Sequence, residues 1–95
     1  MRVLNLKITL RASWAHSLKE KRMVVKSLVQ RLKNKFNISV GEVDKQDIHQ
    51  TIVIGISAVC GSSKQVASTL EHLISFVEEN TDAEIIDIES DNYIF

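Results

Sequence analysis

Hydrophobic residues recur at two different periods along this chain. Over residues 3–11 they alternate with mostly polar neighbours, the regular apolar positions being Leu4, Leu6, Ile8 and Leu10. A period of two predicts a half-buried strand. The same criterion predicts three further strands, over residues 37–44, 48–59 and 83–90.

Two other stretches repeat their apolar residues every three or four positions, which predicts amphipathic helices over residues 17–36 and 62–79. The apolar face of the first comprises Leu18, Val25, Leu28, Val29, Leu32 and Phe36. The face of the second comprises Val66, Leu70, Leu73, Ile74 and Val77. Each helix begins with the spacing of a capping box, Ser17 with Glu20 and Ser62 with Gln65. In such a box the serine hydroxyl accepts a hydrogen bond from the backbone amide of the third residue after it. The side chain of that third residue accepts one in return from the backbone amide of the serine.

The predicted order of elements is βαββαβ. Two split βαβ units with right-handed crossovers pack both helices on one face of a four-stranded antiparallel sheet. The expected fold is therefore a ferredoxin-like α+β sandwich, with an uncovered sheet face that carries Val3, Val53 and Ile85. No linker, repeat or low-complexity segment interrupts the pattern, and 95 residues suit one domain, so residues 1–95 are interpreted as a single domain.

Composition narrows the class of protein. Hydrophobic residues make up 44% and charged residues 25%, which is typical of a soluble globular domain. No apolar run approaches the ~20 residues that a membrane span needs, and no signal peptide is visible before the first strand. Cys60 is the only cysteine, which fits a reducing compartment. We therefore expect a cytoplasmic protein with no membrane partner.

The net charge is zero, but the charges are segregated along the chain. Residues 1–48 hold eleven of the twelve Lys and Arg residues and four acids, a balance of +7. Residues 49–95 hold one lysine and eight acids, a balance of −7. Such a dipolar molecule can present a basic face to a polyanion. The alternative is that the two halves pair with each other, within one chain or between copies.

The first predicted helix carries seven basic residues and one acid. At roughly 100° per residue, four of the basic residues fall within about 60° of each other. These four are Lys19, Arg22, Lys26 and Lys33. Such a stripe can follow phosphates, and the helix N-terminus beside Lys21 offers free amides to an anion. The alternative is a solvated amphipathic helix that happens to use lysine.

Trp14 and His16 precede this helix. An exposed tryptophan can stack on a base, and His16 can contact a phosphate; the alternative is that Trp14 packs over a sheet edge or the helix start. The candidate nucleic-acid contacts are Trp14, His16, Lys19, Lys21, Arg22, Lys26 and Lys33. The open faces of the two central strands offer no aromatic residue, and G-x-x-G is absent. Any RNA contact is therefore expected from backbone and shape, through the helix.

No constellation for catalysis or metal binding is recognisable. The three histidines, His16, His49 and His72, are scattered and form no metal-binding motif. Cys60 precedes a helix start, where thiolates can be activated, but a small buried residue is the preferred interpretation. Three glycines do not supply a phosphate-binding loop. We therefore expect a non-enzymatic protein with no catalytic residue, metal or cofactor.

The chain ends on three large apolar residues, Tyr93, Ile94 and Phe95. Termini usually fray, and this one would expose apolar surface unless it added to the sheet or docked on another copy. Docking is the preferred interpretation, and it predicts a homo-oligomer with these three residues at the interface. A small molecule held between subunits is a third hypothesis, which no particular residue supports.

The run Ser17-Leu18-Lys19-Glu20-Lys21-Arg22 is the most specific segment of the chain. Together with Leu28, Arg31-Leu32, Phe36-Asn37-Ile38-Ser39-Val40, Glu42-Val43 and Ile54-Gly55-Ile56, it resembles the YlxP-like family of small bacterial proteins of unknown function. Gly41 stands where that family often has alanine. The resemblance implies a ferredoxin-like fold, no established activity, and genes that often lie among those for translation and ribosome maturation. It thereby strengthens the expectation of contact with RNA or a ribosomal particle.

Overall fold

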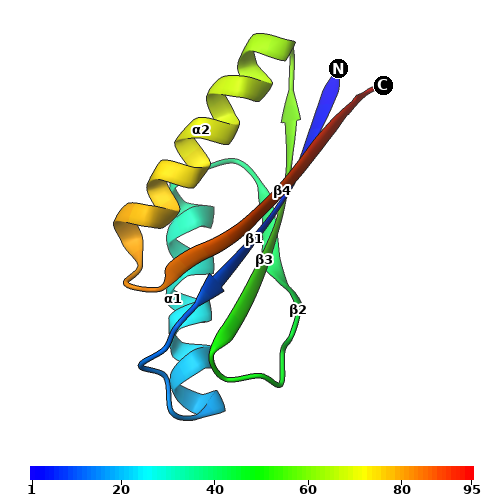
Figure 1. Cartoon of the computed structure of the whole chain (residues 1–95). Coiled ribbons are helices and arrows are strands. Elements are labelled where there is room, and N and C mark those ends of the chain that lie inside the picture. Colours follow the sequence, from blue (N-terminus) through cyan, green and yellow to red (C-terminus); the bar gives the residue numbers. More distant parts are fainter.

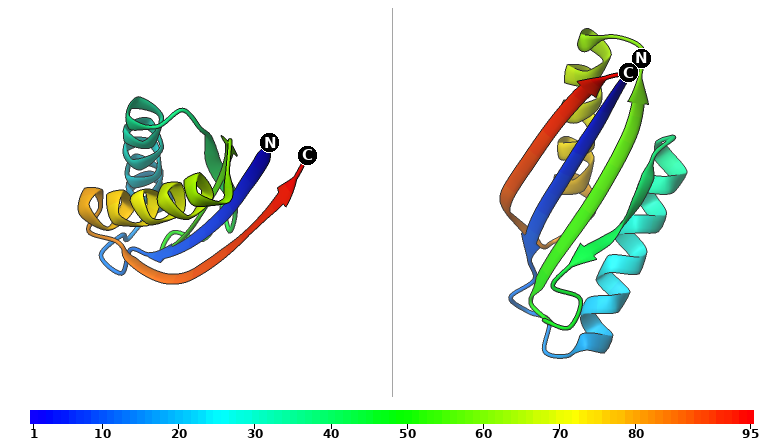
Figure 2. Two further views of the ribbon diagram at one scale, coloured as in Figure 1. Left: turned by 90° about the horizontal axis from the view of Figure 1, so that it is seen from above. Right: turned by 90° about the vertical axis from the view of Figure 1, so that its right-hand side faces the viewer.

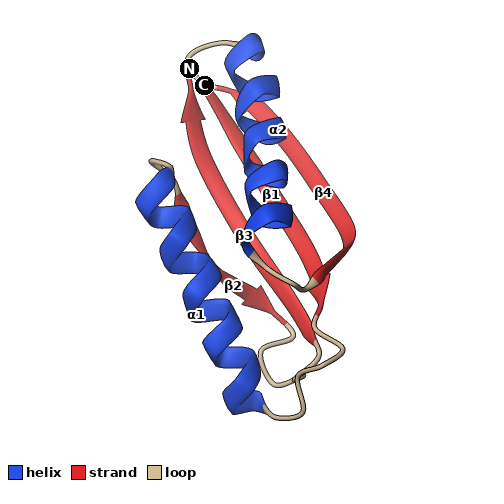
Figure 3. Ribbon diagram, turned by 90° about the vertical axis from the view of Figure 1, so that its left-hand side faces the viewer, coloured by secondary structure: helices blue, strands red, loops and turns tan.

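The computed structural model describes all 95 residues and contains six elements in the predicted order (Figure 1). They are β1 (Arg2–Arg11), α1 (Leu18–Lys35), β2 (Ser39–Asp44), β3 (Thr51–Cys60), α2 (Ser63–Asn80) and β4 (Glu84–Ile94). The strands form one antiparallel sheet in the order β2-β3-β1-β4. Both helices cover the same face of this sheet, and the other face is open (Figures 2 and 3). The architecture is the predicted ferredoxin-like sandwich.

The hydrophobic core lies between the sheet and the two helices. The inward residues of the central strands are at most 5% exposed, and they are Leu4, Leu6, Ile8, Leu10, Ile52, Ile54, Ile56, Ala58 and Cys60. α1 contributes Leu28 and Leu32, and α2 contributes Leu73 and Val77. Burial of aliphatic side chains on this scale is the main stabilising contribution to a domain of this size. The alternation in the sequence therefore identified the buried sheet face correctly.

Both helix starts differ from the predicted capping box in one of its two bonds. The Ser17 hydroxyl accepts from the Glu20 amide at 3.1 Å, as predicted. The Glu20 carboxylate, however, accepts from the amide of His16 at 3.2 Å and not from that of Ser17. The second helix repeats this pattern, with Gln65 accepting from the Gly61 amide at 2.5 Å. Each returning side chain thus satisfies an amide that lies outside its helix.

β4 continues beyond its predicted end at residue 90 and includes most of the chain terminus. Tyr93 lies opposite Val3, and the Phe95 amide donates to the Met1 carbonyl at 2.8 Å. The terminal backbone therefore adds to its own sheet, which is the alternative that the sequence left beside docking. The side chains of Tyr93, Ile94 and Phe95 nevertheless remain 55%, 70% and 86% exposed.

A β-bulge near the start of β4 corrects the expected position of Ile85. The pairing with β1 shifts between Thr9 and Leu10, so that Thr9 lies opposite Asp87 while Leu10 lies opposite Ile85. The extra residue in β4 turns the Ile85 side chain to the helix side, where it packs against the core. Ile85 is therefore absent from the open face on which the sequence had placed it.

Candidate functional site

Four basic side chains of α1 form an exposed stripe, which we call the cationic stripe: Lys19, Arg22, Lys26 and Lys33. The helix rises about 1.5 Å per residue, so the stripe extends about 21 Å from Lys19 to Lys33. None of the four side chains makes an ion pair within the chain. Because α1 is helical over this whole range, the four side chains lie on one flank of it, as the sequence predicted.

The cationic stripe faces away from α2. Arg31 lies on the other flank of α1, and its guanidinium donates to the carbonyl of Asn80, at the end of α2, at 3.3 Å. Because the stripe lies more than 100° from Arg31 around the helix axis, it is directed outward, beyond the β2 edge of the sheet. Figure 3 shows α1 over this side of the sheet and α2 over the side of β1 and β4.

The structure corrects the assignment of Lys21 to the exposed surface. Its side chain is 0% exposed, and Nζ lies 2.8 Å from Oε2 of Glu42 in β2. The same nitrogen donates to the carbonyl of Lys45 at 2.5 Å. Lys21 precedes Leu28 by seven residues and Leu32 by eleven, and these spacings align all three on the buried face. Lys21 therefore anchors α1 to β2 and is unavailable to a polyanion.

Trp14 lies beside a different part of the surface. It is 43% exposed and lines a groove of about 500 Å³ with Glu20, Met23 and Arg31 of α1 and with residues 79–82, at the end of α2 and just after it. This groove occupies the flank opposite the cationic stripe. The Glu20 carboxylate also lies at the N-terminus of α1, where the sequence predicted space for an anion. Of the two residues before the helix, His16 alone remains a candidate for extending the stripe, and its side chain is exposed.

The acidic half of the chain does not neutralise the stripe. Glu84, Asp87, Glu89 and Asp91 lie on β4, at the opposite edge of the sheet from β2. A single ion pair joins the basic and acidic halves, from Lys7 Nζ to Glu89 at 3.0 Å. The hydrogen bond and charge of Glu89 raise the pKa of Lys7 above 10.5, so this pair stabilises the fold below that pH and is lost as the pH rises through the raised pKa.

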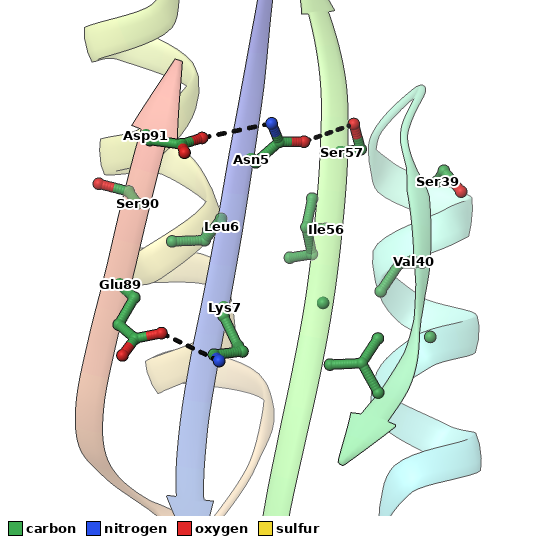
Figure 4. Close-up of a pocket in the computed structure, with 13 residues that line it drawn as sticks. Asn5, Leu6, Lys7, Ser39, Val40, Ile56, Ser57, Glu89, Ser90 and Asp91 are labelled. Carbon is green, nitrogen blue, oxygen red and sulfur yellow. Dashed lines mark hydrogen bonds and ion pairs between the residues drawn. The ribbon is translucent and has the colours of Figure 1, made fainter. Parts of the chain in front are cut away.

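The open sheet face contains a shallow polar groove of about 620 Å³ (Figure 4). Asn5 lies at its centre, accepting from the Ser57 hydroxyl at 3.0 Å and donating to Asp91 at 3.3 Å. On the β2 side, the bottom of the groove is formed by Gly41 and Gly55, which lie directly opposite each other on β2 and β3. Val43 packs closely over Gly55. No aromatic side chain lines this groove, as the sequence predicted.

The remaining candidates lie apart from one another. Cys60 is a buried core residue whose thiol lies 4.0 Å from the Thr69 hydroxyl, in agreement with the preferred interpretation. His16, His49 and His72 are exposed in three different elements or loops. Neither α1 nor α2 combines the length and apolarity that crossing a bilayer requires.

Comparisons with known proteins agree with the sequence resemblance. A family model described as "Protein of unknown function (DUF503)" matches residues 3–90. Uncharacterized protein YlxP of Bacillus subtilis (strain 168) is 42% identical over 64 residues, which cover 67% of this chain and 70% of that protein. Among solved structures, the crystal structure of At3g17210 from Arabidopsis thaliana superposes with a TM-score of 0.51 and 15% identity, covering 97% of this chain and 93% of the other. At that identity the likeness supports the fold alone.

Proposed function

The chain belongs to the DUF503 family of unknown function, with YlxP among its relatives, and on this premise we propose that it binds RNA, free or in a ribosomal particle, through the cationic stripe of α1. We propose it as a binding protein and not as an enzyme. The observation that carries the proposal is that four exposed cations lie along one rigid helix without a carboxylate partner.

Phosphate binding follows from this arrangement because an unpaired surface cation displaces a condensed counterion when it meets a nucleic-acid backbone. A cation already held in an ion pair would first have to give up its carboxylate partner, which would offset the free energy gained from counterion release. Four contacts predict that the logarithm of the binding constant falls with the logarithm of salt concentration at a slope of about −3 to −4. His16 lies next to the start of the stripe and can add a further contact.

The mode of binding expected here is independent of base sequence. The open face of the sheet has no aromatic side chain on which a base could stack in its central groove. Contacts from lysine and arginine to phosphates position a nucleic acid but carry little sequence information. We therefore expect similar affinities for RNAs of equal length and different sequence.

Charge reversal of the stripe tests this proposal. The triple variant Lys19→Glu, Arg22→Glu, Lys26→Glu should bind RNA at least tenfold more weakly than the unchanged protein at low salt, because three phosphate contacts become repulsive. Fluorescence anisotropy with a labelled RNA at several salt concentrations measures both the affinity and the slope. Circular dichroism checks that the fold is intact.

The matched control reverses three exposed cations outside α1, with Arg11→Glu, Lys45→Glu and Lys64→Glu giving the same net charge. It should retain most of the RNA affinity. Equal losses in the two triple variants would show that net charge matters and the stripe does not. Absence of any RNA binding by the unchanged protein at low salt would refute the proposal.

A second candidate function is self-association, favoured by an apolar row at one end of the open face. Val59, Val3 and Tyr93 lie directly opposite one another on β3, β1 and β4, and Tyr93 and Val59 are 55% and 68% exposed. Phe95, two residues beyond Tyr93, extends this exposed end on the same face, whereas the exposed Ile94 side chain lies on the helix face. Apolar surface of this kind on a sheet end can pack against a second copy.

Analytical ultracentrifugation tests self-association. We expect the unchanged protein to form dimers at high concentration and the double variant Val59→Lys, Tyr93→Lys to remain monomeric, because the lysines would be buried without partners. Point substitutions are preferable to truncation, since the terminal backbone belongs to the sheet. The control Met23→Lys, at an equally exposed apolar residue of α1, should leave the dimer unchanged. A monomeric unchanged protein at all concentrations would contradict this function.

A further inference from the structure

β4 leaves a long strand edge without a partner. It is the last strand in the order β2-β3-β1-β4, and it extends over 11 residues at the margin of the sheet (Figures 2 and 3). After the bulge, residues 87–94 pair with β1 in one unbroken register. Unpaired backbone groups on such an edge are a template for another strand.

The backbone groups on this free edge can be identified from the ladder. Met1 and Phe95 exchange two hydrogen bonds, with the Phe95 amide donating to Met1 and the Met1 amino group donating to Phe95. Bonded and unbonded pairs alternate along an antiparallel ladder. The amides and carbonyls that point away from β1 are therefore those of Ile88, Ser90, Asn92 and Ile94.

The side chains of this segment separate by charge between the two faces of the sheet. On the open face it presents three carboxylates, from Asp87, Glu89 and Asp91. On the helix face it presents Ile88 and Ile94, which are 39% and 70% exposed, with small polar residues between them. A strand that joined this edge would meet acids on one face and aliphatic groups on the other.

The occupied edge of β4 shows which chemistry complements these side chains. β1 lies along it with Lys7 opposite Glu89, in an ion pair of 3.0 Å, and with Ile8 opposite Ile88. Each β4 side chain can contact side chains of the strands on both sides of β4. A strand added at the free edge would therefore meet the same acids and isoleucines that β1 meets. β1 alternates polar residues, among them Lys7, with aliphatic residues along this edge, and Asp87 and Asp91 face Thr9 and Asn5 there and not cations. A strand that alternates basic with aliphatic residues should therefore suit the free edge, because it brings a cation to each acid.

Charged side chains, proline and bulges normally block strand addition, and of these the edge carries only acids and one bulge. The chain has no proline, and β4 has no lysine. Its one bulge lies before residue 87 and leaves the following register regular. A second copy is a poor occupant, because β4 against β4 brings acids beside acids, and β2 supplies Glu42 and Asp44 in place of cations.

We propose that the free edge of β4, over residues 87–94, binds an extended segment of a partner protein in which Lys or Arg alternates with aliphatic residues. The segment adds a fifth strand, its cations beside Asp87, Glu89 and Asp91 and its aliphatic side chains beside Ile88 and Ile94. This site lies at the opposite edge of the sheet from the cationic stripe and does not depend on RNA binding.

A capped peptide of about nine residues in which lysine and isoleucine alternate is the probe for the full chain. Binding is followed by amide hydrogen exchange. The expected result is saturable binding with increased protection of the amides of Ile88, Ser90, Asn92 and Ile94. A peptide alternating glutamate with isoleucine, and one with the lysines and isoleucines in two blocks, should each bind at least tenfold more weakly.

Two changes test the role of the backbone and of the acids. Ser90→Pro removes an amide that faces the free edge and is not used in the ladder with β1, so it should reduce peptide binding at least tenfold while the sheet persists. Asp87→Lys should also weaken binding and needs no backbone change. A peptide N-methylated on its bonding amides gives the same test with the protein unaltered, and it should bind at least tenfold more weakly.

The proposal is overturned by any of four results: no saturable binding of the alternating peptide, equal binding of the glutamate or block peptide, full binding of the N-methylated peptide, or protection confined to other strands. Dimerisation of the chain through β4 in preference to peptide binding would likewise overturn it.

Discussion

The Lys21→Met variant should lose about 3–5 kcal/mol of unfolding free energy, because it leaves a largely buried carboxylate without its counter-charge. Lys21 is 0% exposed and the Glu42 side chain only 16% exposed, so water cannot replace the missing ammonium. Methionine preserves most of the apolar volume of the lysine stem, which separates the loss of charge from the creation of a cavity. The carbonyl of Lys45 also loses the donor that it now has at 2.5 Å. Chemical denaturation measures the change.

Removing both charges should recover most of this loss. In the double variant Lys21→Met, Glu42→Leu no ion is left buried, and apolar replacements of buried ion pairs are often neutral or stabilising. The control Lys26→Met removes an exposed, unpaired lysine from the same helix and should change stability by no more than about 0.5 kcal/mol. A loss below about 1 kcal/mol for Lys21→Met would mean that the pair opens to solvent in solution.

The Gly55→Ala variant should be less stable by about 1–3 kcal/mol, because the new methyl group has no room. A Cβ at this position would lie 2.6 Å from Cγ1 of Val43, on the neighbouring strand. Val43 is β-branched and has few alternative rotamers, so either its side chain or β2 must move. Thermal or chemical unfolding measures the loss.

Gly41 provides a control at the directly opposite position of the same strand pair. A Cβ there meets nothing within 4 Å, and neither glycine has a positive φ. Gly41→Ala should therefore stabilise the protein by about 0.4–1 kcal/mol, through the lower entropy of its unfolded chain. Adding Val43→Ala to Gly55→Ala should restore part of the lost stability. A similar loss in both alanine variants would contradict the role assigned to Val43.

The fold was largely predictable because its determinants are local. Alternation assigned Leu6 and Ile54 to the buried face, and the helical period assigned Leu28, Leu32 and Leu73 to the core. Serine spacing placed both helix starts correctly. The bulge beside Ile85 was not predictable in this way, because it depends on the register between β4 and β1.

The candidate site was predictable in part. Lys19, Arg22, Lys26 and Lys33 share a flank because of helix geometry alone. Lys21 was assigned by its charge, although its spacing from Leu28 and Leu32 marks the buried face. Its partner also carried a signal, since Glu42 follows Val40 by two residues and thus faces the same side of β2. A lysine on the buried face of the helix and a glutamate on the buried face of the strand would together have indicated a buried ion pair.

Three properties could be predicted without knowledge of the fold: the order of the elements, their inward faces and the segregation of charge between the two halves of the chain. These properties depend on residues a few positions apart, whose relation the helix and strand repeats define. Three further features appear only in the folded protein: Lys21 meets Glu42, residues 93–95 pair with residues 1–3, and the acids of β4 lie on the sheet edge remote from the cationic stripe. Each of these depends on which segments become neighbours in the sheet, and strand order and register are set by packing across the whole chain.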